Sequence, residues 1–201
     1  MLTVEDRPES VERRLAAGEL ACPVAGCGGV LAPWGFARQR MVLGAGLVAR
    51  TLRPRRSRCR KCRVSHVLLT VFALARRAYA AEVVGAALAG AAAGKGSAKV
   101  AGELGVPRST VRRWTACLAG RAGRVREFFT VLMARTGPDP VMPAGAGPGL
   151  ADAVAAIAGA AAAVAERWPQ LGEVPVWQAA SAASGGLLIA PGWPPGDCNT
   201  K

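Results

Sequence analysis

Two pairs of closely spaced cysteines constrain the fold of this chain more than any other feature. Four residues separate Cys22 from Cys27, two residues separate Cys59 from Cys62, and 31 residues lie between the pairs. Two close pairs on two turns can supply four thiolates to one tetrahedral zinc ion. The basic segment between them is expected to form a β-hairpin with its turn near residues 44–46. The spacing therefore predicts a zinc ribbon in which these four cysteines hold one structural zinc ion.

Other uses of these cysteines have less support. A redox role for residues 59–62 would call for a thioredoxin-like βαβ context, which the surrounding pattern lacks. A catalytic zinc site keeps an open position and usually has a general base nearby, yet residues 20–70 contain no Asp or Glu. Disulfides would be unusual in a cytoplasmic protein. The single histidine, His66, is expected to end the ribbon and to pack against or hydrogen-bond a cysteine turn, although it could instead replace a cysteine as a ligand.

Basic residues are concentrated in the first two thirds of the chain. Residues 1–135 contain 24 Lys and Arg against 8 Asp and Glu, whereas residues 136–201 contain 2 against 5. This asymmetry favours a polyanionic partner, with a basic surface that binds nothing as the simpler alternative. The hairpin arginines are expected to project as one fixed row that follows DNA phosphates or enters a minor groove; they are Arg53, Arg55, Arg56 and Arg58.

Residues 97–117 fit the pattern of a helix-turn-helix. Ala101 falls where two helices would cross closely, Gly105 falls at the turn where a positive φ is convenient, and Pro107 suits the start of a second helix. The five positions expected to be buried are Val100, Leu104, Val106, Val111 and Trp114. A helix around residues 83–91 would complete a three-helix unit.

The second helix of this motif is expected to enter the major groove of DNA. Its outward side chains are Arg108, Ser109, Thr110, Arg112 and Arg113. We expect Ser109 or Arg112 to contact a base edge, because arginine can bind guanine through two hydrogen bonds. Backbone contacts are expected from Arg113, Lys95 and Lys99. The alternatives are that the arginines contact only phosphates, or that the motif binds protein.

The remaining pattern predicts a mainly α-helical protein with a small β zinc ribbon. Ser10 is expected to cap a short N-terminal helix that Gly18 ends, and residues 125–133 form another amphipathic helix. The predicted organisation is a short helix (1–19), the zinc ribbon (20–75), a helix-turn-helix DNA-binding domain with a following helix (76–135), a linker (136–149), and an Ala-rich helix with a Gly/Pro-rich tail (150–201).

The Ala-rich helix allows two interpretations. Five apolar residues are expected to form one stripe along it: Val154, Ile157, Ala161, Val164 and Trp168. Through residues 151–168 it would either pair with a second copy in a homodimer or cover the core of its own chain. Beyond it, residues 186–190 read as a strand.

No signal peptide is evident, and the two longest apolar stretches, residues 78–93 and 151–165, are shorter than the roughly 20 residues that cross a bilayer. We therefore expect a cytoplasmic, nucleoid-associated protein with no membrane partner.

Three segments resemble bacterial, largely actinobacterial, zinc-ribbon and helix-turn-helix proteins related to the N-terminal DNA-binding regions of insertion-sequence transposases. They are CPVAGCGGVLAPWGFAR (22–38), LRPRRSRCRKCRVSHVLL (52–69) and AKVAGELGVPRSTVRRW (98–114). The resemblance implies a DNA-binding accessory or regulatory protein of mobile-element origin, with the four cysteines as metal ligands. The first cysteine gap is long for that family. The three-carboxylate core of a transposase is missing, since residues 136–201 hold only five scattered acids.

The sequence as a whole predicts a protein that binds double-stranded DNA sequence-specifically and is not an enzyme. It would serve as a transposase-related accessory or regulatory factor in transcription or transposition. One alternative is the DNA-binding subunit of a transposase or recombinase that acts with a separate catalytic chain. Another is an RNA-binding zinc-ribbon protein, which would tolerate changes at Ser109 and Arg112.

Overall fold

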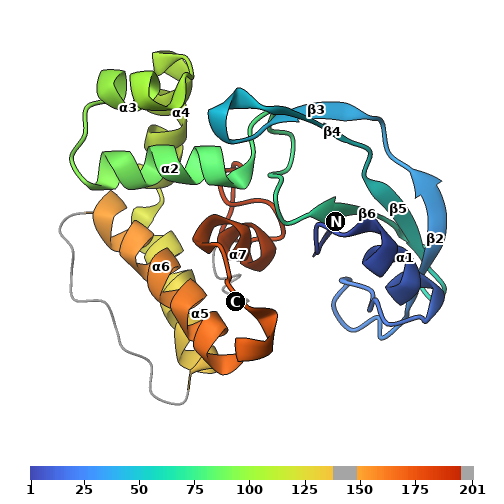
Figure 1. Ribbon diagram of the computed structural model, residues 1–201. Coiled ribbons are helices and arrows are strands. Elements are labelled where there is room, and N and C mark those ends of the chain that lie inside the picture. Colours follow the sequence, from blue (N-terminus) through green and yellow to red (C-terminus); the bar gives the residue numbers. More distant parts are fainter. Residues whose placement is uncertain (138–148, 196–201) are drawn as a thin grey trace.

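The computed structural model describes residues 1–137 and 149–195. A small sheet forms most of the N-terminal part of the chain, and helices form the C-terminal part (Figure 1). The strands are β1 (Leu2–Val4), β2 (Leu31–Phe36), β3 (Arg40–Leu43), β4 (Ala49–Leu52), β5 (Arg55–Cys59) and β6 (Ser65–Thr70). The α-helices are α1 (Pro8–Ala16), α2 (Ala81–Ala92), α3 (Ser97–Leu104), α4 (Arg108–Ala119), α5 (Ala122–Thr136), α6 (Leu150–Arg167) and α7 (Val176–Ala183). The described chain is thus mainly helical with a small sheet, as the sequence predicts.

The sheet has four strands in the order β1-β6-β5-β2. Strands β2, β5 and β6 are antiparallel neighbours, and β1 adds a parallel edge strand that the sequence pattern did not indicate. Strands β3 and β4, which lie between β2 and β5 in the chain, form a separate two-stranded antiparallel ribbon. A short 3-10 turn at Ala45–Leu47 joins them, which confirms the basic hairpin and its turn near residues 44–46.

The first helix begins earlier than predicted. Pro8 occupies its first turn, where a missing N–H costs nothing, so Ser10 lies inside the helix rather than at its cap. The Ser10 hydroxyl instead donates to Glu5 Oε1 at 2.8 Å. Gly18, at φ +70°, follows the last turn and ends the helix as expected. Helix α1 buries Val11 and Leu15 against one side of the sheet.

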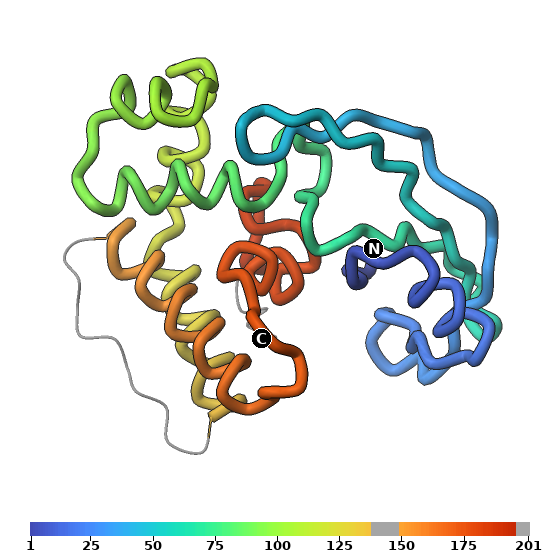
Figure 2. The backbone as a smooth tube through the Cα atoms, viewed as in Figure 1, coloured from blue at the N-terminus to red at the C-terminus, as the bar shows by residue number. Residues whose placement is uncertain are grey.

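The β3–β4 hairpin bridges the sheet and the helices (Figure 2). The backbone N–H of Leu43 donates to the Ala78 carbonyl at 2.7 Å, and the Ala80 N–H donates to the Leu43 carbonyl at 2.8 Å. At the tip, the Leu47 side chain lies against Gly105, within 3.2 Å of where a Cβ would stand. The hairpin therefore holds the two halves of the molecule in a defined arrangement.

Helices α2, α3 and α4 pack together as the sequence predicts. Four of the five expected core positions are buried, and Leu104 is half-buried. Ala101 is buried and Gly105 has φ +67°, so α3 ends in a left-handed residue before α4 begins. Tyr79 packs edge-on against Trp114, with ring centroids 5.1 Å apart.

Helix α6 buries a face that overlaps the predicted stripe at Ile157 and Ala161 but is rotated toward neighbouring alanines. Its buried residues are Ala153, Ala156, Ile157, Ala160, Ala161 and Ala163. Val154 and Val164 are only half-buried, and Trp168 is 40% exposed. Small alanine side chains let α6 lie close along α5, its main neighbour, with α2 across its end (Figure 1). The helix thus covers the core of its own chain.

The predicted strand at residues 186–190 is wrong, because this segment forms turns after α7. Leu188 and Ile189 are buried there by contact with the helical core, not by strand pairing. The guanidinium of Arg77 donates to the Ile189 carbonyl at 2.8 Å, and Arg121 donates to the carbonyls of Ala190 and Trp193. Most of the predicted linker lies outside the described residues.

None of the helices in the described ranges is both long enough and apolar enough to cross a membrane.

Candidate functional site

The four predicted ligand cysteines come together at one end of the sheet. Their Sγ atoms all lie within 4.8 Å of one another, with Cys22 and Cys62 3.7 Å apart and Cys27 and Cys59 3.6 Å apart. Strand β5 ends at Cys59, which is opposite Leu31 of β2, so sheet pairing brings the two cysteine turns side by side. The described residues therefore hold a four-sulfur cluster that can bind a metal ion.

Glycine allows the first cysteine turn to close around the sulfurs. A Cβ on Gly29 would lie 2.6 Å from Cys59 Sγ and 3.3 Å from Cys27 Sγ, so any side chain would occupy the cluster itself. The turn is closed by the Cys22 N–H, which donates to the Gly29 carbonyl at 2.8 Å. Gly28, at φ +60°, takes a left-handed conformation that favours glycine.

The electrostatics of the cluster call for a cation. Burial would raise the pKa of Cys59, but the backbone amides of Cys62 and Lys61, 3.4 and 3.3 Å from its sulfur, lower that pKa to about 6. Burial, reinforced by the neighbouring thiols, raises the pKa of Cys22 to about 12. Four thiols this close together cannot all lose their protons unless a positive charge lies between the resulting thiolates. The donor set therefore fits a bound metal ion.

His66 lies beside the cluster, outside the four-sulfur set. It is buried on β6, and its Nε2 atom is 3.6 Å from Cys22 Sγ. Burial lowers the pKa of this histidine. The predicted contact between His66 and a cysteine turn is present, and it is made with Cys22 of the first turn.

The hairpin arginines do not form a single row. Arg53 and Arg56 are exposed, whereas Arg55 is 17% exposed and pairs with Glu12 of α1 at 2.7 Å. The guanidinium of Arg58 lies over the Trp34 ring, 4.7 Å from its centroid, and donates to a backbone carbonyl. Side chains alternate across a strand, so neighbouring arginines on β5 face opposite sides of the sheet.

The basic residues of the three-helix unit are exposed on α3, on α4 and on the loop before α3. The exposed residues there are Arg108, Ser109, Arg112, Arg113, Lys95 and Lys99, with Thr110 half-buried. Arg108 Nε donates to Ser97 Oγ at 3.2 Å, which ties the start of α4 to the start of α3. Lys95 forms an exposed ion pair with Glu103 at 2.8 Å. The structure thus presents a basic helix end to solvent.

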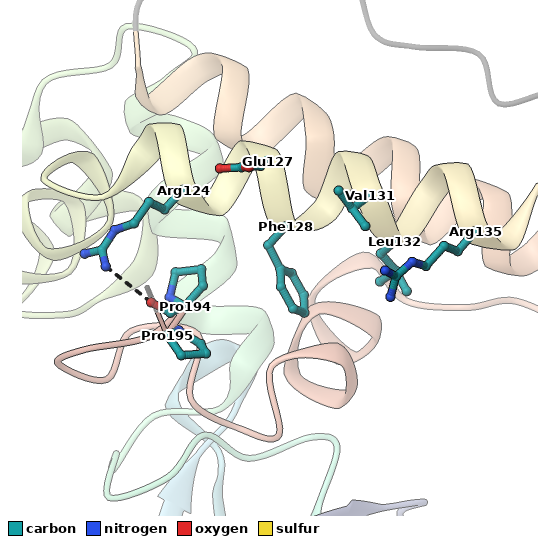
Figure 3. A pocket seen from close by; sticks show the side chains of 8 residues that line it. All are labelled: Arg124, Glu127, Phe128, Val131, Leu132, Arg135, Pro194 and Pro195. Carbon is teal, nitrogen blue, oxygen red and sulfur yellow. Dashed lines mark hydrogen bonds between the residues drawn. The ribbon is translucent and has the colours of Figure 1, made fainter. Parts of the chain in front are cut away.

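Sequence reasoning missed the pairing of arginines with aromatic rings on the sheet, and it missed the cavities of the helical half. Trp34 and Phe36 are both about half exposed on β2 and lie under hairpin arginines, a pairing that their position just before the basic run could have indicated. A cavity of about 370 Å³ lies between α5 and the segment Pro194–Pro195 (Figure 3). An apolar cavity of about 470 Å³ lies among α5, α6 and α7. Both cavities join distant segments, so no local motif marks them.

Neither a family model, a curated protein nor a solved structure matches this chain at a significant level.

Proposed function

We propose that this chain is a sequence-specific double-stranded DNA-binding protein, built from a zinc ribbon and a helix-turn-helix. The observation that carries the proposal is the set of exposed basic side chains on the first two turns of α4, which begins just after a left-handed turn at Gly105. An α-helix fits the major groove, and helices in this arrangement enter it with their N-terminal residues against base edges. A regulatory or accessory role in mobile-element biology, as the resemblance implies, is part of the same proposal.

The exposed polar residues in and beside α4 fall into two groups, one proposed to contact bases and the other phosphates. Arg112 lies one turn beyond the start of the helix and is exposed, so its guanidinium would read a base edge, with Ser109 beside it. Arg113, Lys95 and Lys99 would neutralise phosphates around the groove. Such contacts release counterions, so binding would weaken steeply as salt is raised.

The metal of the cysteine cluster is, in this proposal, a structural zinc ion. Four thiol donors in two close pairs suit zinc in preference to ions that favour oxygen ligands. Its role would be to hold the two cysteine turns and so fix the base of the hairpin. The hairpin tip at Leu47 lies against Gly105, so a rigid ribbon would also support the turn that positions α4.

Replacing Arg112 with alanine is expected to weaken binding to a selected DNA site by about 1–3 kcal/mol, because a base-edge contact is lost. Binding to random DNA should fall much less. Dissociation constants for both duplexes, measured by fluorescence anisotropy at a fixed salt concentration, test this expectation.

The matched control is Arg13→Ala on α1, which removes the same charge from an exposed position far from α4. It should leave the ratio of specific to random binding unchanged. Equal losses on both duplexes for Arg112→Ala would reduce this residue to a phosphate contact and remove the main support for base reading by α4.

A further inference from the structure

Trp34 is an exposed aromatic residue on a sheet face that the proposed duplex contact does not use. Its side chain is 51% exposed, and the Arg58 guanidinium lies 4.7 Å from its ring centroid. The Arg58 Nε atom donates to the Arg63 carbonyl at 2.9 Å, which fixes the guanidinium in place. The pair therefore presents a preformed aromatic surface next to a positive charge.

The two faces of the sheet have different surroundings. One face carries Leu31, Cys59 and Leu68, which are buried together with Leu15 of α1. Arg58 pairs with Ala32 in the register and, by strand alternation, points away from that buried face. Trp34, two residues after Ala32 and in contact with Arg58, lies on this outer face.

The outer face is basic as well as aromatic. Arg56 is exposed two residues before Arg58, so the pleat places both arginines on the same side. Across the strand pairing, Arg58 lies opposite Ser65, which is also exposed. Strands β2, β5 and β6 contribute no acidic residue. The face therefore complements a negatively charged ligand that also offers a flat apolar surface.

A β-bulge gives Phe36 a different environment. The register shifts between Pro33 and Phe36, which places Phe36 opposite Arg55 and under the guanidinium of Arg53, 4.7 Å from the ring centroid. Arg55 is held on the α1 side by its ion pair with Glu12. Trp34 and Arg58 are thus separate from the Phe36 cluster, and they lie on the outer face of the sheet, opposite α1.

We propose that this outer face, formed by Trp34, Arg56 and Arg58, binds unpaired bases of single-stranded nucleic acid. A base would stack on the Trp34 ring while the arginines contact the flanking phosphates. Bases inside a duplex are already stacked on their neighbours, so this site would select single strands over double-stranded DNA. The inference is independent of duplex reading by α4, since it uses residues of the other half of the molecule.

The test measures binding of fluorescently labelled oligo(dT) and oligo(U) to the full-length, zinc-loaded protein. Trp34→Ala should weaken binding of the preferred oligonucleotide by about tenfold to a hundredfold, as expected for loss of one stacked base. Trp34→Phe should retain much of the affinity. Trp168→Ala removes another exposed tryptophan, 40% exposed at the end of α6, and should change nothing. Comparison of the two oligonucleotides distinguishes a DNA from an RNA ligand.

Zinc content and circular dichroism of Trp34→Ala verify that the ribbon is intact, and Arg58→Gln provides a second variant that should also weaken binding. Unchanged affinity in both variants, or no binding of either oligonucleotide at low salt, would overturn the inference. Arg112→Ala separates the two proposals, because it should impair the selected duplex and spare the single strand. If the parent protein shows no sequence preference on duplex DNA but binds single strands in a way that depends on Trp34, the proposed function fails and the single-strand inference stands.

Discussion

Replacing Cys59 with serine is expected to remove the bound metal, which we propose to be zinc, and to unfold the cysteine-bearing end of the sheet. Cys59 is fully buried, receives two backbone N–H groups on its sulfur, and lies 3.6 Å from Cys27. A hydroxyl is a poor substitute for a thiolate ligand, and the remaining three sulfurs would be left as crowded thiols. Structural zinc contributes about 10–16 kcal/mol in small zinc-finger peptides, which is comparable to the entire free energy of unfolding of an ordinary domain, about 5–15 kcal/mol.

The measurement is zinc per chain by atomic emission, combined with thermal unfolding. The parent protein should carry about one zinc ion, as four-cysteine structural sites do. Cys117→Ser is the matched control, because Cys117 lies on α4 outside the cluster and its sulfur contacts the Ile189 carbonyl at 3.4 Å. A parent protein that is folded without metal, or a Cys59→Ser variant with full zinc occupancy, would reject the metal site.

Replacing Gly85 with alanine is expected to destabilise the helical half by about 1–2 kcal/mol net. Helix α2 approaches α7 so closely that a Cβ on Gly85 would lie 1.9–2.4 Å from atoms of the Trp177 indole ring. The ring is nearly buried and belongs to the main core, so it has little room to move. Overpacking of this kind typically costs about 1–3 kcal/mol, and a clash with a rigid ring belongs at the upper end.

Alanine is a better helix former than glycine by about 1 kcal/mol, which offsets only part of this loss. Gly102→Ala is therefore an informative control. Gly102 lies on α3 with open space where its Cβ would stand, so the same substitution should be neutral or stabilising. Denaturant unfolding of both variants gives the comparison, and equal stability of Gly85→Ala and the parent would show that α2 and α7 do not pack as described.

Local patterns with strict spacing predicted the structure well. The two cysteine pairs fold into one cluster, and the segment around Gly105 forms two helices joined by a left-handed turn, because each pattern specifies several positions at once. Elements determined by packing were predicted less well. The predicted stripe on α6 is buried at Ile157 and Ala161, but Val154 and Val164 are only half-buried, because close contact with α5 favours the small alanines.

Two further errors have similar physical causes. The apolar run at residues 186–190 has strand-like composition, but Leu188 and Ile189 are buried by the helical core without strand pairing. Along the hairpin, charge composition indicated a uniform row of arginines. Strand alternation and Glu12 of α1, a residue distant in sequence, instead turn Arg55 inward and leave Arg58 beside Trp34.

The central claim, that this chain reads a DNA sequence, is tested most directly by selecting fragments of genomic DNA on the purified, zinc-loaded protein at physiological salt. Sequencing of the bound pool should show strong enrichment of fragments that share one short motif, and Arg112→Ala should reduce that enrichment. A bound pool with the same composition as the input, recovered by the folded and zinc-containing protein, would contradict sequence-specific binding.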